Sequence, residues 1–482
     1  MMFKYNKNII IVTAFFLAFG LSSFTLPSIS ELSSPSLDWI KQTGAKVFPK
    51  GNTIYNVKDY GAVNDGKTMN TKAIQKTINI CAKNGGGIVK FDTGEYLTGS
   101  IFLKSGVHLV IDENVTILGS QDIKDYREIQ TRIAGIEMKW PAALINVKGQ
   151  HNVAISGEGT IDGQGKTFWD EYWRTRKIYE KKGLRWIVDY DVKRPRTLLV
   201  QECKDVTIKD ITLKRAGFWT VHILYSNHVT VNGITIRNNI GGHGPSTDGI
   251  DIDSSTYVRI ENCDVDCNDD NYCLKAGRDA DGLKVNKPTE YVWIHDCIAR
   301  AGAGLLTIGS ETSGSIHHVL VEDSKAIGTS NGVRFKSALT RGGTVSDIHV
   351  RDLKMEDVNK AIAVSMNWNP SYSYSKLPKG YNYDSIPLRW KKLLEKVPED
   401  KGIPTMKDIY ISNLNIKGCK TAIYASGMKK SLLEDFYLKD INIRAEEAGK
   451  IAYAKDWTFK NVSIRAKDGS KVKVSHSIHV KL

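Results

Sequence analysis

Hydrophobic and polar residues alternate in a short motif that recurs along the chain from Val206 onward. Each copy has two hydrophobic residues around a charged or polar one, then Asp or Asn, then a second alternating apolar pair. Val258, Val292, Val319 and Ile348 mark successive copies, which are spaced 34, 27 and 29 residues apart. Strand-like alternation interrupted by Gly, Asn and Asp turns at this period is typical of a solenoid of short parallel strands. The copies include DVTIKDITL, HVTVNGITI, YVRIENCDV, YVWIHDCIA, HVLVEDSKA and DIHVRDLKM.

The repeat predicts an all-β fold, a right-handed parallel β-helix in which inward Val, Ile and Leu side chains stack from coil to coil. A β-sandwich or a propeller is the alternative, but the chain lacks a blade signature and its coils vary in length. Cys263, Cys297 and Ser324 occupy equivalent places in neighbouring copies, which indicates an interior ladder of small residues. A helix expected near residues 71–83 would cap the open end of the solenoid and protect it from edge pairing.

Two long stretches interrupt the repeat, at residues 166–196 and between residues 348 and 409. Both are rich in Trp and Tyr, and the first also carries several Arg residues. Aromatic rings and cations suit sugar stacking and carboxylate pairing, although the same residues could form packing flaps. We therefore expect the two interruptions to lie beside a carbohydrate site or to serve as flaps.

The amino terminus has the features of a secretory signal peptide. Two lysines precede an apolar run over residues 9–21, which is too short for a transmembrane helix of about 20 apolar residues. We predict a signal peptide over residues 1–26, a leader segment over 27–50 and a parallel β-helix domain over 51–482. The mature protein is expected to be exported, either to the periplasm or to the extracellular medium.

Net charge and cysteine content limit the classes of binding partner that the sequence favours. The formal net charge of +14 favours a polyanionic partner, or else the excess lysine merely maintains solubility. Nucleic acid is disfavoured because no basic helix, zinc-finger spacing or ribonucleoprotein motif is found, and an acidic polysaccharide suits an exported protein better. Seven cysteines leave one unpaired, and no CxxC pair with metal-like spacing occurs. We expect a monomer with no cofactor, no metal and no membrane partner.

Three carboxylates recur at the spacing of one coil. Asp248 opens the stretch DGIDID, and Asp269 and Asp270 follow 21 and 22 residues later. Since adjacent parallel strands lie about 4.8 Å apart, these side chains should cluster on one face. Two coils further on, Arg334 and Lys336 are two residues apart and hence on the same side of a strand.

This constellation suits acid/base chemistry on an anionic substrate. Inverting hydrolysis of a glycosidic bond uses one protonated carboxyl and one carboxylate that activates water, about 6.5–9.5 Å apart. Crowded like charges raise the pKa of one carboxyl, which supplies the acid. On spacing alone, an acidic cluster with Arg and Lys fits a calcium-dependent lyase equally well.

Nearly the whole mature chain resembles family 28 of the glycoside hydrolases, the polygalacturonase and rhamnogalacturonase family. The resemblance implies a right-handed parallel β-helix that cleaves galacturonic acid bonds of pectin with inversion. The matching stretches, in the family's order, are DYGAVNDGKTMNTKAIQ, GGGIVKF, ISGEGTIDGQG, KRPRTLL, STDGIDID, NDDNYCLKAG, GAGLLTIGSE and GVRFKS.

Position by position, the resemblance implies a role for each charged residue of the cluster. Asp269 matches the general acid, and Asp248 and Asp270 match the two bases that activate water. Arg334 and Lys336 match the cations that bind the carboxylate of the substrate.

The chain departs from the family pattern at Gly302-Ala303-Gly304, where the family has Gly-His-Gly. His243 lies in a Gly-His-Gly on a different coil, so we assign it only a substrate-binding role at the rim. Trp368 is the nearest aromatic residue to a place where polygalacturonases tend to carry a tyrosine, and it either binds substrate by stacking on a sugar or packs within a flap. His222 is expected to be structural. Because rhamnogalacturonan-directed relatives can lack the family histidine, Ala303 favours rhamnogalacturonan or its oligosaccharides as the substrate.

Other functions remain open at this point. A polygalacturonase acting on homogalacturonan, by endo or exo attack, is the main alternative, and closure of the cleft by the two interruptions would decide between the two modes. A calcium-dependent pectate lyase is a further alternative. A non-catalytic polysaccharide-binding solenoid is disfavoured because all three carboxylates are present.

Overall fold

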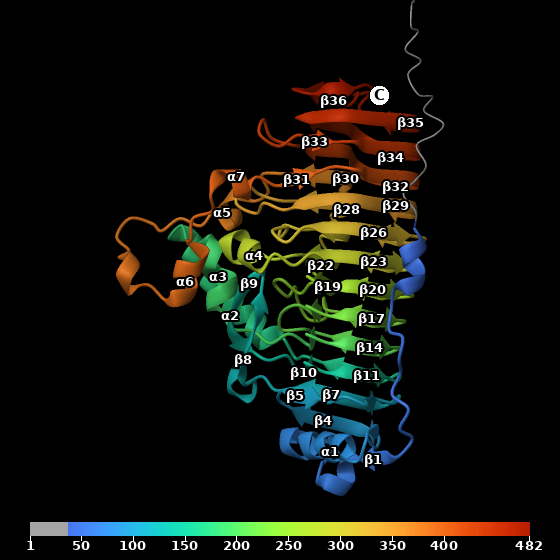
Figure 1. Ribbon diagram of the computed structural model, residues 1–482, viewed down its shortest axis with the longest axis vertical. Coiled ribbons are helices and arrows are strands. Elements are labelled where there is room, and N and C mark those ends of the chain that lie inside the picture. Colours follow the sequence, from blue (N-terminus) through green and yellow to red (C-terminus); the bar gives the residue numbers. More distant parts are fainter. Residues whose placement is uncertain (1–36) are drawn as a thin grey trace, which may run out of the picture. The chain divides into compact units, whose positions relative to one another are not determined.

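Short parallel strands form three ladders between residues 54 and 480 (Figure 1). The structure is a computed structural model that describes residues 37–482, so the predicted signal peptide lies outside the described residues. Most coils supply one strand to each ladder, and each strand pairs in parallel with its counterpart on the next coil. The parallel β-helix predicted from the repeat is thereby confirmed.

The first ladder carries the candidate site on its outward side. It contains β5 (Ile101–Leu103), β10 (Ile145–Lys148), β13 (Leu198–Gln201), β16 (Val221–Leu224), β19 (Ile250–Asp253), β22 (Asp270–Lys275), β25 (Gly304–Ile308), β28 (Asn331–Lys336), β30 (Lys360–Ser365) and part of β32 (Ile409–Ser426).

The second ladder carries the hydrophobic repeat that dominates the sequence. It contains β1 (Ile54–Asn56), β3 (Gly87–Lys90), β6 (Val107–Val110), β11 (His151–Ser156), β14 (Lys204–Lys209), β17 (Asn227–Asn232), β20 (Thr256–Glu261), β23 (Thr289–His295), β26 (Ile316–Glu322), β29 (Thr344–Glu356), β32, β34 (Phe436–Ala452) and β35 (Ala454–Ala466).

The third ladder consists of shorter strands. It contains β2 (Asp65–Met69), β4 (Gly94–Thr98), β7 (Val115–Gly119), β12 (Thr160–Asp162), β15 (Thr212–Lys214), β18 (Thr235–Arg237), β21 (Asp264–Asp266), β24 (Ile298–Arg300) and β27 (Lys325–Ile327). The last coils also include β31 (Thr405–Met406), β33 (Leu433–Glu434), β36 (Lys473–Ser475) and β37 (Ile478–Val480).

The register of the second ladder matches the sequence repeat. Val258 pairs with Val292, Val292 with Val319 and Val319 with Ile348, and all four are buried in the continuous core inside the coils. The ladder of small residues is also present, because the backbone N–H of Cys297 donates to the hydroxyl of Ser324 at 3.1 Å. All seven cysteines are buried and free.

The predicted capping helix is α1 (Thr71–Lys83) (Figure 1). Its buried residues Ile74, Ile78 and Cys81 recur at intervals of three to four, so that one apolar stripe of the helix covers the core. Within the described part of the chain, no helix has both the length and the apolar character needed to cross a membrane.

Residues 38–50, the described part of the predicted leader, lie across several coils rather than apart from them. Trp39, in the 3₁₀ helix η2 (Asp38–Gln42), packs against Tyr291 with ring centroids 5.8 Å apart. The backbone N–H of Ala45 donates to Thr230 at 2.8 Å, and that of Lys46 donates to Asp205 at 2.7 Å. The segment therefore runs from the coil of β23 back towards earlier coils.

The two interruptions fold into helices that gather on one side of the solenoid, together with an antiparallel hairpin (Figure 1, left). The first contains α2 (Lys166–Lys181), η5 (Arg185–Ile187) and α3 (Val188–Asp191). The second contains α5 (Pro370–Ser373), η6 (Tyr383–Ser385), α6 (Leu388–Leu393) and α7 (Glu399–Gly402). The hairpin consists of β8 (Glu128–Ile133) and β9 (Ile136–Pro141), and α4 (Asp279–Val285) contacts β9.

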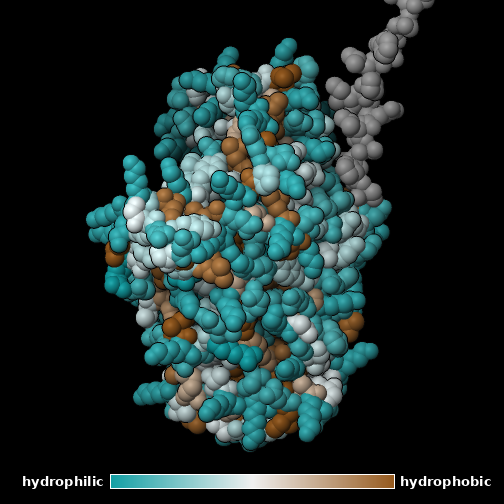
Figure 2. Space-filling view, turned by 60° about the vertical axis from the view of Figure 1, so that its left-hand side comes forward, coloured by the Kyte–Doolittle hydropathy of each residue, from teal (hydrophilic) through white to brown (hydrophobic). Residues whose placement is uncertain are grey.

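A second hydrophobic core, separate from the interior of the coils, joins these segments. It includes Trp140 of the hairpin, Trp186 of the first interruption and Trp390 of the second. The rings of Trp186 and Trp390 meet edge to face at 5.6 Å, and the indole N–H of Trp186 donates to the carbonyl of Lys376 at 3.0 Å. We call the hairpin and the two interruptions, which this core joins, the flap. On the face of the molecule in Figure 2, hydrophilic residues cover most of the surface, with hydrophobic residues in groups between them.

Candidate active site

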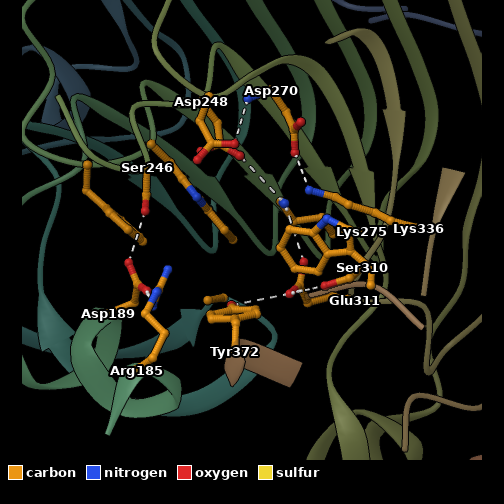
Figure 3. Close-up of a pocket in the computed structure, with 15 residues that line it drawn as sticks. Arg185, Asp189, Ser246, Asp248, Asp270, Lys275, Ser310, Glu311, Lys336 and Tyr372 are labelled. Atoms are coloured by element: carbon orange, nitrogen blue, oxygen red, sulfur yellow. Dashed lines mark hydrogen bonds and ion pairs between the residues drawn. The ribbon is translucent and has the colours of Figure 1, made fainter. Parts of the chain in front are cut away.

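The three carboxylates predicted from the coil spacing come together in one pocket (Figure 3). Asp248 lies just before β19, and Asp269 and Asp270 lie at the start of β22, which pairs with β19 in register. Each of the three offers an oxygen within 4.8 Å of the other two. Stacking of neighbouring coils thus produces the cluster, as the spacing predicts.

Asp270 is held as a carboxylate by two cations. Its Oδ2 accepts from Lys336 Nζ at 2.7 Å, and its Oδ1 accepts from Arg334 Nη1 at 3.0 Å and from the hydroxyl of Thr307 at 2.8 Å. Burial opposes the charged form, but Lys336, Arg334 and Lys275 outweigh it and hold the pKa of Asp270 well below its usual range. The cation pair predicted from GVRFKS is therefore placed directly on a carboxylate of the cluster.

The pKa of Asp269 is shifted in the opposite direction from that of Asp270. Burial raises its pKa, and the adjacent charge of Asp270 raises it further, while Lys336 and Arg334 only partly offset this. One of its oxygens accepts the backbone N–H of Asp270 at 3.0 Å. Two adjacent carboxyl groups with pKa values displaced in opposite directions form an acid and base pair.

Asp248 is buried, and its pKa is raised well above the usual range, first by burial and then by the neighbouring charges of Asp251 and Asp269. Its Oδ2 lies 3.6 Å from Lys275 Nζ. Burial and the neighbouring carboxylates thus disfavour the ionised form of Asp248, whereas the cations favour the ionised form of Asp270.

Lys275, Asp251 and Glu311 belong to the site and were not predicted from the sequence. Lys275 Nζ lies 3.6 Å from Asp251 and 3.4 Å from Glu311, and 4.9 Å from the centre of the Trp219 ring. Strand alternation is the sequence signal that could have identified Asp251 and Lys275. Asp251 pairs with Cys273, and Asp253 pairs with Lys275. All four therefore lie on the outward side of the first ladder, which the flap covers.

The flap supplies the opposite wall of the pocket. Arg185 and Asp189 come from the first interruption, Tyr372 from the second and Ala134 from the turn of the hairpin. Ser246, two residues before Asp248, donates its hydroxyl to Asp189 at 3.0 Å. The interruptions therefore line the pocket as well as packing on each other.

Trp368 lies beside the two cations, as expected of a residue near the sugar. Its ring centre is 4.4 Å from Lys336 Nζ and 5.7 Å from the guanidinium carbon of Arg334, and the residue lines the pocket.

The structure does not place His243 among the residues that line the pocket. The side chain is exposed, its Nδ1 is 3.3 Å from Asn239, and its carbonyl accepts the indole N–H of Trp173 at 3.0 Å. His222 is buried, with Nδ1 2.8 Å from Arg196 and Nε2 3.4 Å from Asp253.

Ala303 lies next to the acid pair through its backbone. Its N–H donates to the carbonyl of Asp269 at 2.8 Å, and its own carbonyl accepts from Asn331 at 2.6 Å. At the place of the family's histidine, the chain therefore has a residue that bonds Asp269 through its backbone and has no imidazole.

The separation of the carboxyl groups differs from the general rule for inverting enzymes. The closest carboxyl oxygens of Asp248, Asp269 and Asp270 lie within 4.8 Å of one another, whereas the two carboxyl groups of an inverting enzyme are usually about 6.5–9.5 Å apart. The reason is geometrical, since the carboxyls sit on adjacent coils or on adjacent residues of one coil.

The same three aspartates could in principle hold a cation. Both oxygens of Asp270 already bind cationic side chains, and Lys275 lies against Asp248. A divalent ion here would face three positive side chains at close range, so the donor set suits Ca²⁺ poorly.

A parallel β-helix with an acidic pair and cations in a covered pocket defines a carbohydrate-active enzyme class. The model of glycosyl hydrolases family 28 matches residues 81–387, and the chain belongs to this family of enzymes. It is 32% identical to a probable polygalacturonase of Vitis vinifera over 74% of this chain and 73% of the relative. It is 29% identical to an endo-polygalacturonase of Pectobacterium carotovorum subsp. carotovorum over 61% of this chain and 71% of the relative.

Among solved structures, an exopolygalacturonase from Thermotoga maritima matches with a TM-score of 0.71 and 24% identity, covering 91% of this chain and 95% of that one. This likeness supports the fold. The two relatives are named as polygalacturonases, and neither is named for rhamnogalacturonan. The substrate preference inferred from Ala303 therefore has no support from them.

Proposed function

We propose that the protein is a polygalacturonase, which hydrolyses α-linked galacturonic acid bonds in homogalacturonan or its oligosaccharides. The observation that carries this proposal is the pair of adjacent aspartates with oppositely displaced pKa values, held beside two cations that can bind a uronate carboxylate. The proposal replaces rhamnogalacturonan as the preferred substrate, and the relatives' names support this change.

In the proposed reaction, Asp269 donates its proton to the leaving glycosidic oxygen. Asp270, the ionised carboxylate, takes a proton from the attacking water, and Asp248 orients that water from the neighbouring coil. The raised pKa of Asp269 favours the protonated form that an acid needs, and the lowered pKa of Asp270 favours the ionised form that a base needs. Arg334 and Lys336 retain further N–H donors for a substrate carboxylate, and Trp368 offers a ring for the sugar.

We propose inversion on the basis of family membership, because the short carboxyl separation by itself fits the general rule for retention. Time-resolved proton NMR of the protein with polygalacturonan, and with rhamnogalacturonan in parallel, tests both points. Inversion requires the β-anomer first from the α-linked substrate, and the α-anomer first would reject it. Faster cleavage of rhamnogalacturonan than of polygalacturonan would reject homogalacturonan as the preferred substrate. Unsaturated uronide signals would indicate a lyase.

We also propose exo attack at a chain end. Arg185, Tyr372 and Ala134 come from three separate segments of the flap and line one side of the pocket, which supports a closed end rather than an open groove. Exo attack releases reducing ends with little early loss of polymer viscosity. A steep fall in viscosity at the first few per cent of bond cleavage would show endo attack instead.

The proposed polymer lies outside the cell, and we propose that the protein is exported by the segment over residues 1–26. Fractionation of the native host, followed by N-terminal sequencing of the mature chain, tests export. A cytoplasmic protein that retains Met1 would contradict it.

A further inference from the structure

A further cation, in addition to Arg334, Lys336 and Lys275, reaches the pocket from the flap, on the side away from Lys336 (Figure 3). Arg185 lies in η5, and its side chain is 14% exposed. In Figure 3, Asp248 and Asp270 lie on one side of the pocket, and Arg185 and Asp189 lie on the other. Arg185 is not used by the mechanism proposed above.

The charge around Arg185 is not balanced. Asp189 is shared by Arg185 at 2.8 Å and by Arg194 at 3.0 Å, so one carboxylate serves two guanidinium groups. The two arginines hold the pKa of Asp189 at about 2 in spite of burial. Arg194 is fully buried and also donates to the carbonyl of Pro245. Of the two arginines that share Asp189, Arg185 is the one that lines the pocket.

Arg185 is also held in place. Its guanidinium carbon lies 5.1 Å from the centre of the Tyr372 ring, and the Tyr372 hydroxyl donates to Glu311 at 3.4 Å. Its Nε is buried, makes no hydrogen bond within residues 37–482 and lies 3.9 Å from Glu180 Oε1. A fixed guanidinium in the lining of a pocket is suited to recognise a carboxylate.

We propose that Arg185 binds the carboxylate of the sugar on the flap side of the scissile bond, while Arg334 and Lys336 bind the carboxylate on the other side. The inference rests on the proposed function and makes it more specific, because it requires uronic acids on both sides of the cleaved bond. A polymer of contiguous galacturonic acid satisfies this requirement. A polymer in which every second sugar is neutral does not.

The test compares trigalacturonate with two analogues in which one terminal carboxyl group is reduced to the neutral alcohol. With the wild-type enzyme, we expect kcat/KM to fall about 10- to 100-fold for the analogue that loses the contact with Arg185. Arg185→Leu should cleave trigalacturonate about 10- to 100-fold more slowly, and should cleave trigalacturonate and that analogue at rates within about threefold of each other.

Arg174→Leu is the matched control, since Arg174 is an exposed, ion-paired arginine of the same interruption. It should retain both the rate and the discrimination of the wild type, and a melting temperature for each variant checks folding. If Arg185→Leu loses the same factor on trigalacturonate and on both analogues, Arg185 is structural and the inference is overturned.

The substrate series also tests the inference without a variant. If the wild type cleaves trigalacturonate and both analogues at similar rates, the inference fails while the proposed function stands. If it cleaves neither polygalacturonan nor its oligosaccharides, the proposed function fails and the inference fails with it.

Discussion

Replacing Lys336 by methionine should move the pH profile of the enzyme to higher pH. Lys336 is buried, and its Nζ lies 2.7 Å from Asp270 Oδ2. It is also the largest single charge that holds the pKa of Asp270 low. Methionine keeps the length and the apolar stem of the side chain but removes the positive charge. Asp270 would then have to be ionised with Arg334 and Lys275 alone.

The expected size of the shift follows from the lost interaction. A hydrogen bond to a charged group contributes about 1.5–3 kcal/mol, and one pKa unit corresponds to about 1.36 kcal/mol. The pKa of Asp270 should therefore rise by about one to two units. Since Lys336 also lowers the pKa of Asp269, that pKa should rise as well. Both limbs of the bell-shaped profile should move upward, because the base must lose its proton and the acid must keep its own.

The assay is kcat/KM from the release of reducing ends at low substrate concentration from about pH 1.5 to 8, because the pKa of Asp270 lies well below its usual range. This ratio reports the free enzyme, and the two apparent values belong to the coupled pair rather than to single residues. Loss of substrate binding lowers the whole pH profile without moving its limbs. The pH of the limbs therefore reports the effect of Lys336 on Asp270, and the height of the profile reports its binding of substrate. Circular dichroism at each pH restricts the comparison to folded protein.

Lys336→Arg is the control, because it preserves the charge and should leave both limbs near their wild-type positions. A Lys336→Met profile whose acidic limb coincides with that of the wild type would refute the role of Lys336 in ionising Asp270. The base would then have to be sought elsewhere in the cluster.

Three further predictions follow from other contacts. Asp269→Asn should lower kcat about 10²- to 10⁴-fold with an unchanged melting temperature, because the amide cannot donate the proton, and a near-normal rate would reject Asp269 as the acid. Trp390→Ala should open the second hydrophobic core of the flap and make polymer viscosity fall faster per bond cleaved, and an unchanged viscosity profile would show that the flap does not set the mode of attack. Asp253 is buried against Arg132 and His222, and its pKa is about 2. The ionised carboxylate therefore stabilises the folded protein by about 2 kcal/mol above pH 4. This contribution is lost as the pH falls towards 2. Urea unfolding between pH 3 and 7 should show that loss in the wild type and a flatter dependence in Asp253→Asn; equal slopes would contradict the assignment.

The solenoid could be predicted because its information is local and repeated. Each copy of the motif specifies a strand and its inward residues, and stacking follows from the repeat, as the pairing of Val258 with Val292 shows. The carboxylate cluster could be predicted for the same reason, since Asp248 and Asp269 are separated by about one coil. The capping helix needed only the apolar spacing over residues 71–83.

The flap could not be predicted because its contacts join segments that are distant in the sequence and carry no repeat. Trp186 and Trp390 are 204 positions apart, and no pattern within either interruption indicates that the two rings meet. The placement of Arg185 depends on that packing. His243 was assigned a rim role from its proximity to Asp248 in sequence, but the intervening turn leaves it exposed beside Asn239.

The coil spacing of the β-helix also accounts for the chemistry of the site. Asp269 and Asp270 are adjacent residues of one coil, and the parallel ladder places Asp248 on the next coil at a backbone spacing of about 4.8 Å, so the three carboxyl groups lie close together. Mutual repulsion at this distance would leave several protons on the cluster if no cation intervened. Arg334 and Lys336, two coils further along, reach back to Asp270 alone and so select one carboxylate to ionise. Asp269, next to that charge, is thereby favoured to keep its proton. The arrangement along the ladder, rather than the distance between the carboxyls, distinguishes the acid from the base.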